Sequence, residues 1–185
     1  MALSATIFKA TLQISDLDRN HYAEHELILA RHPSETDERM MVRLLAFALH
    51  ADERLNFTRG LCVDEEPDLW QKGLADEIDV WIEVGLPDER RVRKACGRAR
   101  QVWLYLYGGR AVEPWWQRNA DKLRRFANLR VIELPEKATR GLAGLARRSM
   151  RLSCTVQDGE IWLSDEEQSL AVTPRIRLGP GADQS

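Results

Sequence analysis

One stretch, residues 67–94, constrains the fold most, because an alternating strand is followed there at once by a helix. Within residues 78–84, successive side chains point to opposite faces of a strand, and one face is apolar throughout. Asp79 and Glu83 lie on the other face. Strand-then-helix units usually cover a sheet, and covered carboxylates need partners, of which a metal ion is one. The alternative is a half-exposed strand whose two acids are solvated.

The segments around this stretch predict a mixed α/β (α+β) fold. We expect residues 3–31 to form an N-terminal β-hairpin. The core then follows as helix, strand, strand, strand, helix and strand, at residues 35–51, 57–62, 68–72, 78–84, 88–98 and 101–107. The last strand–helix–strand unit is a right-handed crossover, which makes its two strands parallel.

The remaining segments predict helices that flank the sheet and β additions at the C-terminus. We expect a helix, a strand and a helix, then a hairpin that turns at residues 157–159, and last an edge strand: residues 114–128, 129–134, 136–149, 151–163 and 170–178. We therefore predict a single domain over residues 1–178. Residues 179–185 are expected to be a disordered tail.

Composition and cysteine spacing limit the classes of protein that fit. At 185 residues, with 44% hydrophobic and 30% charged residues, the chain is long enough to bury a core. No apolar run reaches the about 18 residues of a membrane span, so we expect no membrane partner. Cys62, Cys96 and Cys154 form no CxxC pair, which argues against a zinc site and predicts a cytoplasmic protein with buried thiols.

Charge is strongly segregated along the chain, although the net charge is only -2. Residues 1–89 hold 8 Lys and Arg against 19 Asp and Glu, whereas residues 90–151 hold 17 against 4. An acidic segment beside a basic one suits a phosphodiester substrate, because phosphates bind cations and react at metal ions. The alternative is that folding mixes the two segments over one surface.

The acids of the central stretch resemble part of a nuclease signature. In the restriction-endonuclease-like nucleases this signature is Pro-Asp, a spacer, Asp or Glu, any residue, and Lys. Here Pro67-Asp68 is followed by Glu83-Val84-Gly85, so the acids match and Gly85 stands where the lysine belongs. Lys94, in the next helix, is our candidate for a displaced lysine, and Arg91 is its competitor. Glu38 fits the place of a glutamate that such nucleases often take from the preceding helix.

Four longer segments resemble the YaeQ family of bacterial proteins. They are residues 30–36 (ARHPSET), 51–62 (ADERLNFTRGLC), 81–91 (WIEVGLPDERR) and 157–165 (QDGEIWLSD). The likeness covers almost the full length and ends near Leu178. It implies a variant of the restriction-endonuclease-like fold and of its PD-(D/E)XK motif.

The resemblance also implies a chemistry for the acids and the basic helix. Asp68 and Glu83, with Asp79 or Glu38 as a further ligand, would hold Mg²⁺ or Mn²⁺ through carboxylate oxygens. The ion would polarise a scissile phosphate and activate a bound water, and Lys94 or Arg91 would orient that water or stabilise the developing charge. Further contacts to the phosphate backbone, without sequence readout, would come from arginines of the basic segment: Arg90, Arg91, Arg93 and Arg98.

Three functions therefore fit the sequence. The first is a metal-dependent nuclease or an enzyme that acts on another phosphodiester. The second, suggested by Gly85, is a catalytically degenerate nuclease-fold protein that binds nucleic acid or a protein partner without cleavage. The third is an interaction module whose acids are solvated. Metal binding separates the third from the first, and cleavage separates the second from the first.

Overall fold

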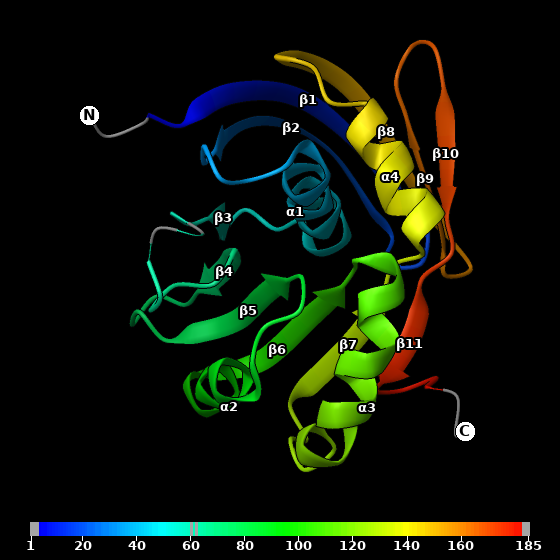
Figure 1. The fold of residues 1–185 in the computed structure, drawn as a ribbon. Coiled ribbons are helices and arrows are strands. Elements are labelled where there is room, and N and C mark those ends of the chain that lie inside the picture. The colour runs from blue at the N-terminus through cyan, green and yellow to red at the C-terminus, as the bar shows by residue number, and fades with distance from the viewer. Residues whose placement is uncertain (1–3, 60, 62, 183–185) are drawn as a thin grey trace. The chain divides into compact units, whose positions relative to one another are not determined.

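The structure, a computed structural model, describes residues 4–59, 61 and 63–182 (Figure 1). Contacts divide the chain into two compact units, and each unit is built from two separate stretches. Met1–His50 and Lys137–Pro174 belong to the first unit, and Ala51–Glu136 and Arg175–Ser185 belong to the second. The single domain predicted over residues 1–178 stays a prediction.

As described, the first unit is a five-stranded mixed sheet with two helices. Its elements are β1 (Thr6–Asp16), β2 (His21–Arg31), α1 (Asp37–His50), α4 (Glu136–Gly144), β8 (Ser149–Gln157), β9 (Glu160–Ser164) and β10 (Ser169–Val172). The strand order is β10-β9-β8-β1-β2, and β1 and β8 are its parallel pair. The antiparallel pairing of β1 with β2 confirms the predicted N-terminal hairpin. β8 and β9 meet at the predicted turn, where Asp158 and Gly159 have positive φ.

The described part of the second unit is a six-stranded mixed sheet that carries the central stretch. Its elements are β3 (Leu55–Phe57), β4 (Leu69–Lys72), β5 (Ile78–Val84), α2 (Glu89–Arg98), β6 (Ala99–Leu106), η2 (Gly109–Ala111), α3 (Val112–Leu123), β7 (Leu129–Glu133) and β11 (Arg175–Leu178). The strand order is β11-β7-β6-β5-β4-β3. β5, β6 and β7 are parallel to one another, and the other neighbours are antiparallel. This arrangement confirms a mixed α/β fold and the adjacency of the four strands predicted for the core.

β5 is buried on both faces, as a strand followed by a covering helix should be. Trp81 is 1% exposed on one face and Ile82 is 0% exposed on the other. α2 begins at an N-cap, Asp88, whose side chain accepts a hydrogen bond from the Arg91 N–H. α2 buries Val92 and Ala95 in the same cluster as Trp81.

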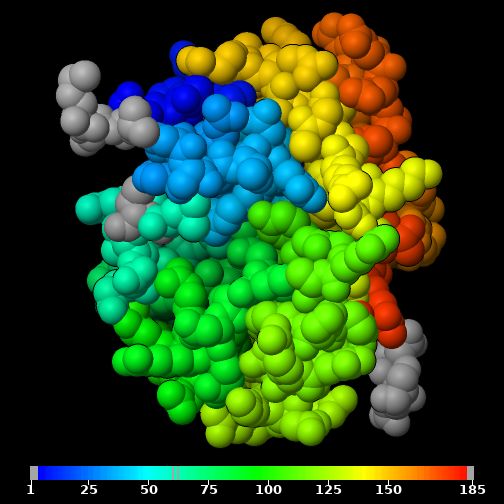
Figure 2. All heavy atoms as spheres, in the orientation of Figure 1, coloured from blue at the N-terminus to red at the C-terminus, as the bar shows by residue number. Residues whose placement is uncertain are grey.

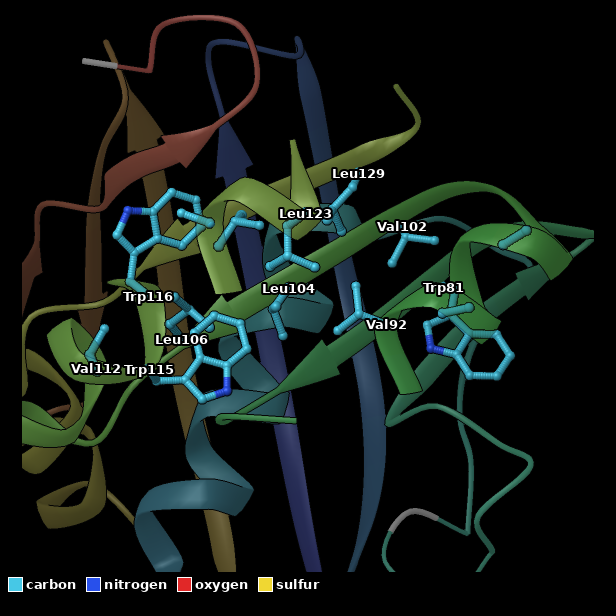
Figure 3. Packing of buried hydrophobic residues seen from close by; sticks show 14 of the residues in the cluster. Trp81, Val92, Val102, Leu104, Leu106, Val112, Trp115, Trp116, Leu123 and Leu129 are labelled. Atoms are coloured by element: carbon cyan, nitrogen blue, oxygen red, sulfur yellow. The ribbon is translucent and has the colours of Figure 1, made fainter. Parts of the chain in front are cut away.

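The core of the second unit fills the space between its sheet and its two helices. Figure 3 shows labelled side chains of α2 and α3 directed toward those of β5, β6 and β7. These buried residues include Trp81, Val92, Val102, Leu104, Leu106, Val112, Trp115, Trp116, Leu123 and Leu129. Figure 2 shows α2 and α3 at the surface of this unit, where most of their charged side chains are exposed. The core therefore fixes α2 over the face of the sheet that carries Trp81 and Glu83.

Several boundaries in the sequence prediction were wrong. The helices predicted over residues 114–128 and 136–149 end at Leu123 and Gly144. The strand predicted over residues 57–62 is β3, which begins two residues earlier and ends at Phe57, while residues 60 and 62 lie outside the described chain. The single edge strand predicted over residues 170–178 is two strands in different sheets, because β10 pairs with β9 and β11 pairs with β7. Pro174 lies between them and has no N–H to continue a ladder.

The remaining expectations concern membrane spans, the cysteines and the C-terminal tail. No helix of the described residues is both long and apolar enough to cross a membrane. Cys96 and Cys154 are free thiols whose pKa burial raises to about 11 and about 12, so both are poor nucleophiles. Cys62 and residues 183–185 of the predicted tail lie outside the described chain, while the Ala182 N–H donates to the Gly179 carbonyl in a turn.

Candidate functional site

Asp68 lies immediately before β4 and is locked against β5. Its N–H donates to the Ile82 carbonyl at 3.0 Å, and its Oδ2 accepts from the Val84 N–H at 2.8 Å. Thr58 also holds the backbone of Asp68, because its N–H donates to the Asp68 carbonyl at 3.2 Å. Asp68 is 2% exposed. The antiparallel β4–β5 pair therefore places this carboxylate beside the C-terminal end of β5.

Glu83 lies at that end of β5, on the face that α2 covers. Its Oε1 accepts from the Trp81 indole N–H at 2.9 Å and from Arg91 Nε at 2.9 Å. Trp81 is two residues earlier on the same face, so its indole reaches the carboxylate along the strand. Glu83 is 4% exposed, and both donors hold its side chain in one orientation.

The environment of Glu83 disfavours its ionised form. Burial, and secondly repulsion from Asp68, raise the pKa of Glu83 from 4.5 to about 7, although Arg91 and Trp81 act in the opposite direction. Two buried carboxylates that repel each other at neutral pH are typical of sites built for catalysis or for cation binding rather than for stability. Asp68 and Glu83, which the sequence pattern paired, are thus brought together by the fold.

Arg91, and not Lys94, is the α2 cation that contacts Glu83. The Lys94 ammonium instead pairs with the carboxylate of Glu65. Residues 63–66 lie beside α2 and supply this anion, so the candidate lysine and its competitor have different partners in the structure. Whether either cation has a catalytic role stays a prediction.

Gly85, which stands where the nuclease signature has its lysine, also has a backbone conformation that favours glycine. Its φ is +105°, which is rarely adopted by residues with a side chain. A Cβ at this position would meet only Tyr107 Cε1, at 3.9 Å, so the backbone, and not a lack of space, excludes other residues. The lysine of the nuclease signature is therefore incompatible with the way β5 ends.

Asp79 and Glu38 each have other partners in the structure. Asp79 precedes Glu83 by four residues, about 13 Å of strand rise. It is paired with Arg54 at 3.2 Å and with Arg100 at 3.4 Å. Glu38 belongs to the first unit, where its Oε1 accepts from the Thr139 hydroxyl at 2.7 Å. The predicted addition of Glu38 to the acids stays a prediction.

The predicted phosphate-binding arginines of α2 fall into two groups. Arg90 and Arg93 are exposed and form no ion pair with any described residue. Arg91 and Arg98 are engaged by the chain itself, since Arg91 contacts Glu83 and Arg98 donates to the Glu65 carbonyl at 2.9 Å. Arg98 also lies over the Trp81 ring, 5.3 Å from its centroid.

Asp68 and Glu83 are the two carboxylates that this site offers to a metal ion from its own unit as described. Within the described ranges, no group of three or more His, Cys, Asp or Glu side chains could hold a metal ion. Asp68 and Glu83 offer hard oxygen ligands, which suit Mg²⁺ and Mn²⁺ better than zinc. Mg²⁺ commonly binds through one or two carboxylates and completes its shell with water and substrate phosphate. The pair therefore fits such an ion.

Sequence reasoning missed two parts of the site. It placed Trp81 on the face of Glu83 but gave the indole no role, although spacing of two on a strand was sufficient to predict a contact. It also missed residues 63–66, whose carbonyl and carboxylate oxygens bind Arg91, Lys94 and Arg98. No sequence pattern shows where a loop lies, so this second omission had no available signal.

Comparison with known proteins identifies the family. The family model described as YaeQ protein matches residues 1–174. The chain belongs to the YaeQ family. It is 54% identical over 172 residues to the uncharacterized protein YaeQ of Escherichia coli (strain K12), which covers 93% of this chain and 95% of that protein. The corresponding YaeQ protein of Salmonella typhi is 52% identical over the same shares of both chains.

Two crystal structures of YaeQ proteins share the fold. The YaeQ protein of Xanthomonas axonopodis pv. citri is 53% identical and aligns with a TM-score of 0.93, over 96% of this chain and 100% of that chain. The YaeQ protein of Pseudomonas syringae is 34% identical and aligns with a TM-score of 0.91, over 95% and 97% of the two chains. The architecture described above is therefore the YaeQ fold.

Proposed function

We propose that this YaeQ protein is a cytoplasmic, metal-dependent nuclease or related phosphodiesterase with a variant PD-(D/E)XK site. The observation that carries the proposal is the buried Asp68–Glu83 pair, in which burial and Asp68 raise the pKa of Glu83 to about 7. A divalent cation between the two carboxylates would relieve their repulsion. Asp68 lies immediately before β4 and Glu83 lies in β5, which pairs with β4 and is followed by a crossover helix.

The chain's own residues would prepare both carboxylates for a metal ion. The Val84 N–H holds Asp68, and the Trp81 indole holds Glu83, so neither side chain needs to reorient on binding. Mg²⁺ would supply Lewis-acid activation of a phosphate and of a bound water. Arg91 would take the part of the absent lysine, since its planar guanidinium can bind a phosphate with two parallel hydrogen bonds.

A non-cleaving function is the second candidate. Gly85 excludes the signature lysine, and Arg91 already neutralises Glu83, so the site also fits a protein that binds nucleic acid or a protein partner without cleavage. A phosphoryl-transfer site needs a cation at the developing charge, and an arginine that stays bound to Glu83 cannot supply it. The two candidates differ in turnover and not in architecture.

Calorimetry with Mg²⁺ and Mn²⁺ tests the proposed site. We expect the parent to bind, and Asp68→Asn and Glu83→Gln each to abolish the binding heat. Asp79→Asn is the matched control, because it removes an acid from the same strand face that is held by Arg54 and Arg100. Binding by Glu83→Gln with parent affinity would contradict the metal site.

Cleavage assays then separate the two candidates. Labelled single-stranded and duplex DNA and RNA are incubated with the parent in Mn²⁺, beside Glu83→Gln and Arg91→Met. Cutting that is lost in both variants supports the nuclease and assigns Arg91 to the reaction. Metal binding without cutting of any of these substrates favours the non-cleaving candidate.

A further inference from the structure

Residues 63–66, which we call the acidic loop, lie along one side of α2. Arg91 donates to the Asp64 carbonyl at 3.0 Å through Nη1 and to the Glu66 carbonyl at 2.7 Å through Nη2. Arg98 donates to the Glu65 carbonyl at 2.9 Å, and its guanidinium lies 3.6 Å from the Glu65 carboxylate. Lys94 pairs with the same carboxylate. Three successive residues of the loop thus provide acceptors to three cations of one helix.

The three cations form a stripe along α2. Arg91, Lys94 and Arg98 are spaced three and four residues apart, so they lie on one side of the helix. The stripe rises about 10 Å along the helix axis. A row of this length can contact more than one phosphate of a nucleic-acid strand. Its first member, Arg91, also contacts Glu83, which joins the stripe to the Asp68–Glu83 pair.

We propose that the acidic loop is an internal mimic of a nucleic-acid backbone, which covers the phosphate-binding stripe of Arg91, Lys94 and Arg98 until a nucleic acid displaces it. This inference rests on the proposed function, because it assigns the regulation of the same site. The loop copies the relevant chemistry, in that it presents a carboxylate and successive carbonyl oxygens to the cations that phosphate oxygens would use. Lys94 holds the pKa of Glu65 below its usual value, as it would that of an acidic phosphate.

The contacts of the acidic loop are of a kind that a polyanion can replace. The Glu65 and Lys94 side chains are 65% and 43% exposed, and ion pairs between exposed side chains are weak and screened by salt. A nucleic acid that takes their place gains the release of condensed counterions. Arg90 and Arg93 are exposed on the neighbouring side of α2 and form no ion pair with a described residue, so they can contact the nucleic acid before the loop leaves.

Oligonucleotide affinity tests the mimic without any need for metal or cleavage. A short fluorescein-labelled single-stranded DNA is titrated in EDTA with the parent, Glu65→Gln and Asp64→Asn, and binding is followed by anisotropy over a range of salt. Asp64→Asn is the matched control, because it removes one charge from the same loop while its carbonyl contact to Arg91 remains. We expect Glu65→Gln to bind several-fold more tightly than Asp64→Asn. Its plot of log affinity against log salt should be steeper by about 0.7 for each cation uncovered.

A double variant assigns the effect to the stripe. Glu65→Gln combined with Lys94→Met should lose part of the gain in affinity, because one of the two cations that face the Glu65 carboxylate is then absent. Equal affinities and equal salt slopes for Glu65→Gln and Asp64→Asn would overturn the mimic, since loss of one negative charge would explain both. Absence of binding by every variant would also overturn it, and so would displacement of the DNA by polyglutamate at equal charge, which would assign the stripe to acidic protein.

The outcome is separable from that of the proposed function. If the mimic is wrong but the metal site is right, Mg²⁺ still binds the parent and not Glu83→Gln, while Glu65→Gln leaves DNA affinity unchanged relative to Asp64→Asn. If the metal site is wrong, the Mg²⁺ heat is absent while the difference between Glu65→Gln and Asp64→Asn remains.

Discussion

At the scale of single residues, Glu83 is the side chain for which the sequence pattern and the structure point most clearly to the same role. Alternation along residues 78–84 put it on the face opposite the apolar one, and the fold gives it two donors and a carboxylate neighbour. Stability is thereby reduced at neutral pH, because the ionised form is the one that burial disfavours. Retention of an acid under such a cost is a mark of function rather than of packing.

The pH dependence of unfolding follows from this side chain. The pKa of Glu83 is about 7 in the folded chain, against an ordinary value of 4.5, so the folded chain holds its proton over a range in which the unfolded chain has lost it. The stability due to Glu83 is therefore complete below pH 4.5 and is lost as the pH rises to 7, by about 3 kcal/mol. We expect the free energy of unfolding of Glu83→Gln, measured relative to the parent by denaturant titration, to increase by this amount between about pH 4.5 and 8.

Mg²⁺ provides the internal control for this titration. A bound cation favours the ionised carboxylates, so saturating Mg²⁺ should stabilise the parent more at about pH 8 than at about pH 5 and should leave Glu83→Gln unchanged. If the difference in free energy of unfolding between Glu83→Gln and the parent stays constant from about pH 4.5 to 8, Glu83 does not titrate in this range.

At the scale of elements, the hydrophobic periodicity of the sequence was sufficient to predict the central strand and the helix after it. Alternation identified β5, and the basic run after Pro87 identified α2 with Val92 and Ala95 inward. Periodicity could not choose between Arg91 and Lys94, because both lie on the side of α2 that faces the acidic loop. The choice depends on where that loop lies, which is set by contacts between residues about 30 positions apart. The acids were therefore predictable, and the cation beside them was not.

Two glycines at the ends of these elements should respond oppositely to the same substitution. Gly85 ends β5 with φ of +105°, so Gly85→Ala should strain the backbone and reduce stability by about 1–3 kcal/mol. Gly97 lies within α2, and a Cβ there would have no neighbour within 4 Å, so Gly97→Ala should raise stability by about 0.5–1 kcal/mol. Denaturant titrations of the two variants measure both effects. A stable Gly85→Ala protein would mean that the backbone accepts a side chain where the nuclease signature has its lysine.

At the scale of the whole molecule, the chain passes between its two units three times. The passages fall after His50, Glu136 and Pro174. Local sequence signals do not report such passages, because each segment has the periodicity of its element whichever sheet receives it. Residues 170–178 illustrate this limit. Their apolar positions read as one strand, whereas Pro174 divides them between β9 and β7.

The end of the chain supplies the last prediction. β11 pairs with β7, and the Arg177 side chain, only 7% exposed, binds Glu133 and Glu113 and lies over the Trp116 ring. A chain that ends at Pro174 would expose the edge of β7, leave both glutamates without their arginine, and uncover Trp116. We expect a loss of at least about 2 kcal/mol, which lowers the melting temperature by roughly 4–8 °C in a protein of this size. The control ends at Leu178, keeps β11, and removes only residues 179–185, so it should melt within about 2 °C of the parent. Equal melting temperatures for the two truncated chains would mean that β11 contributes nothing to its sheet. A lower melting temperature for the shorter chain alone would show that β11 stabilises the sheet of the second unit.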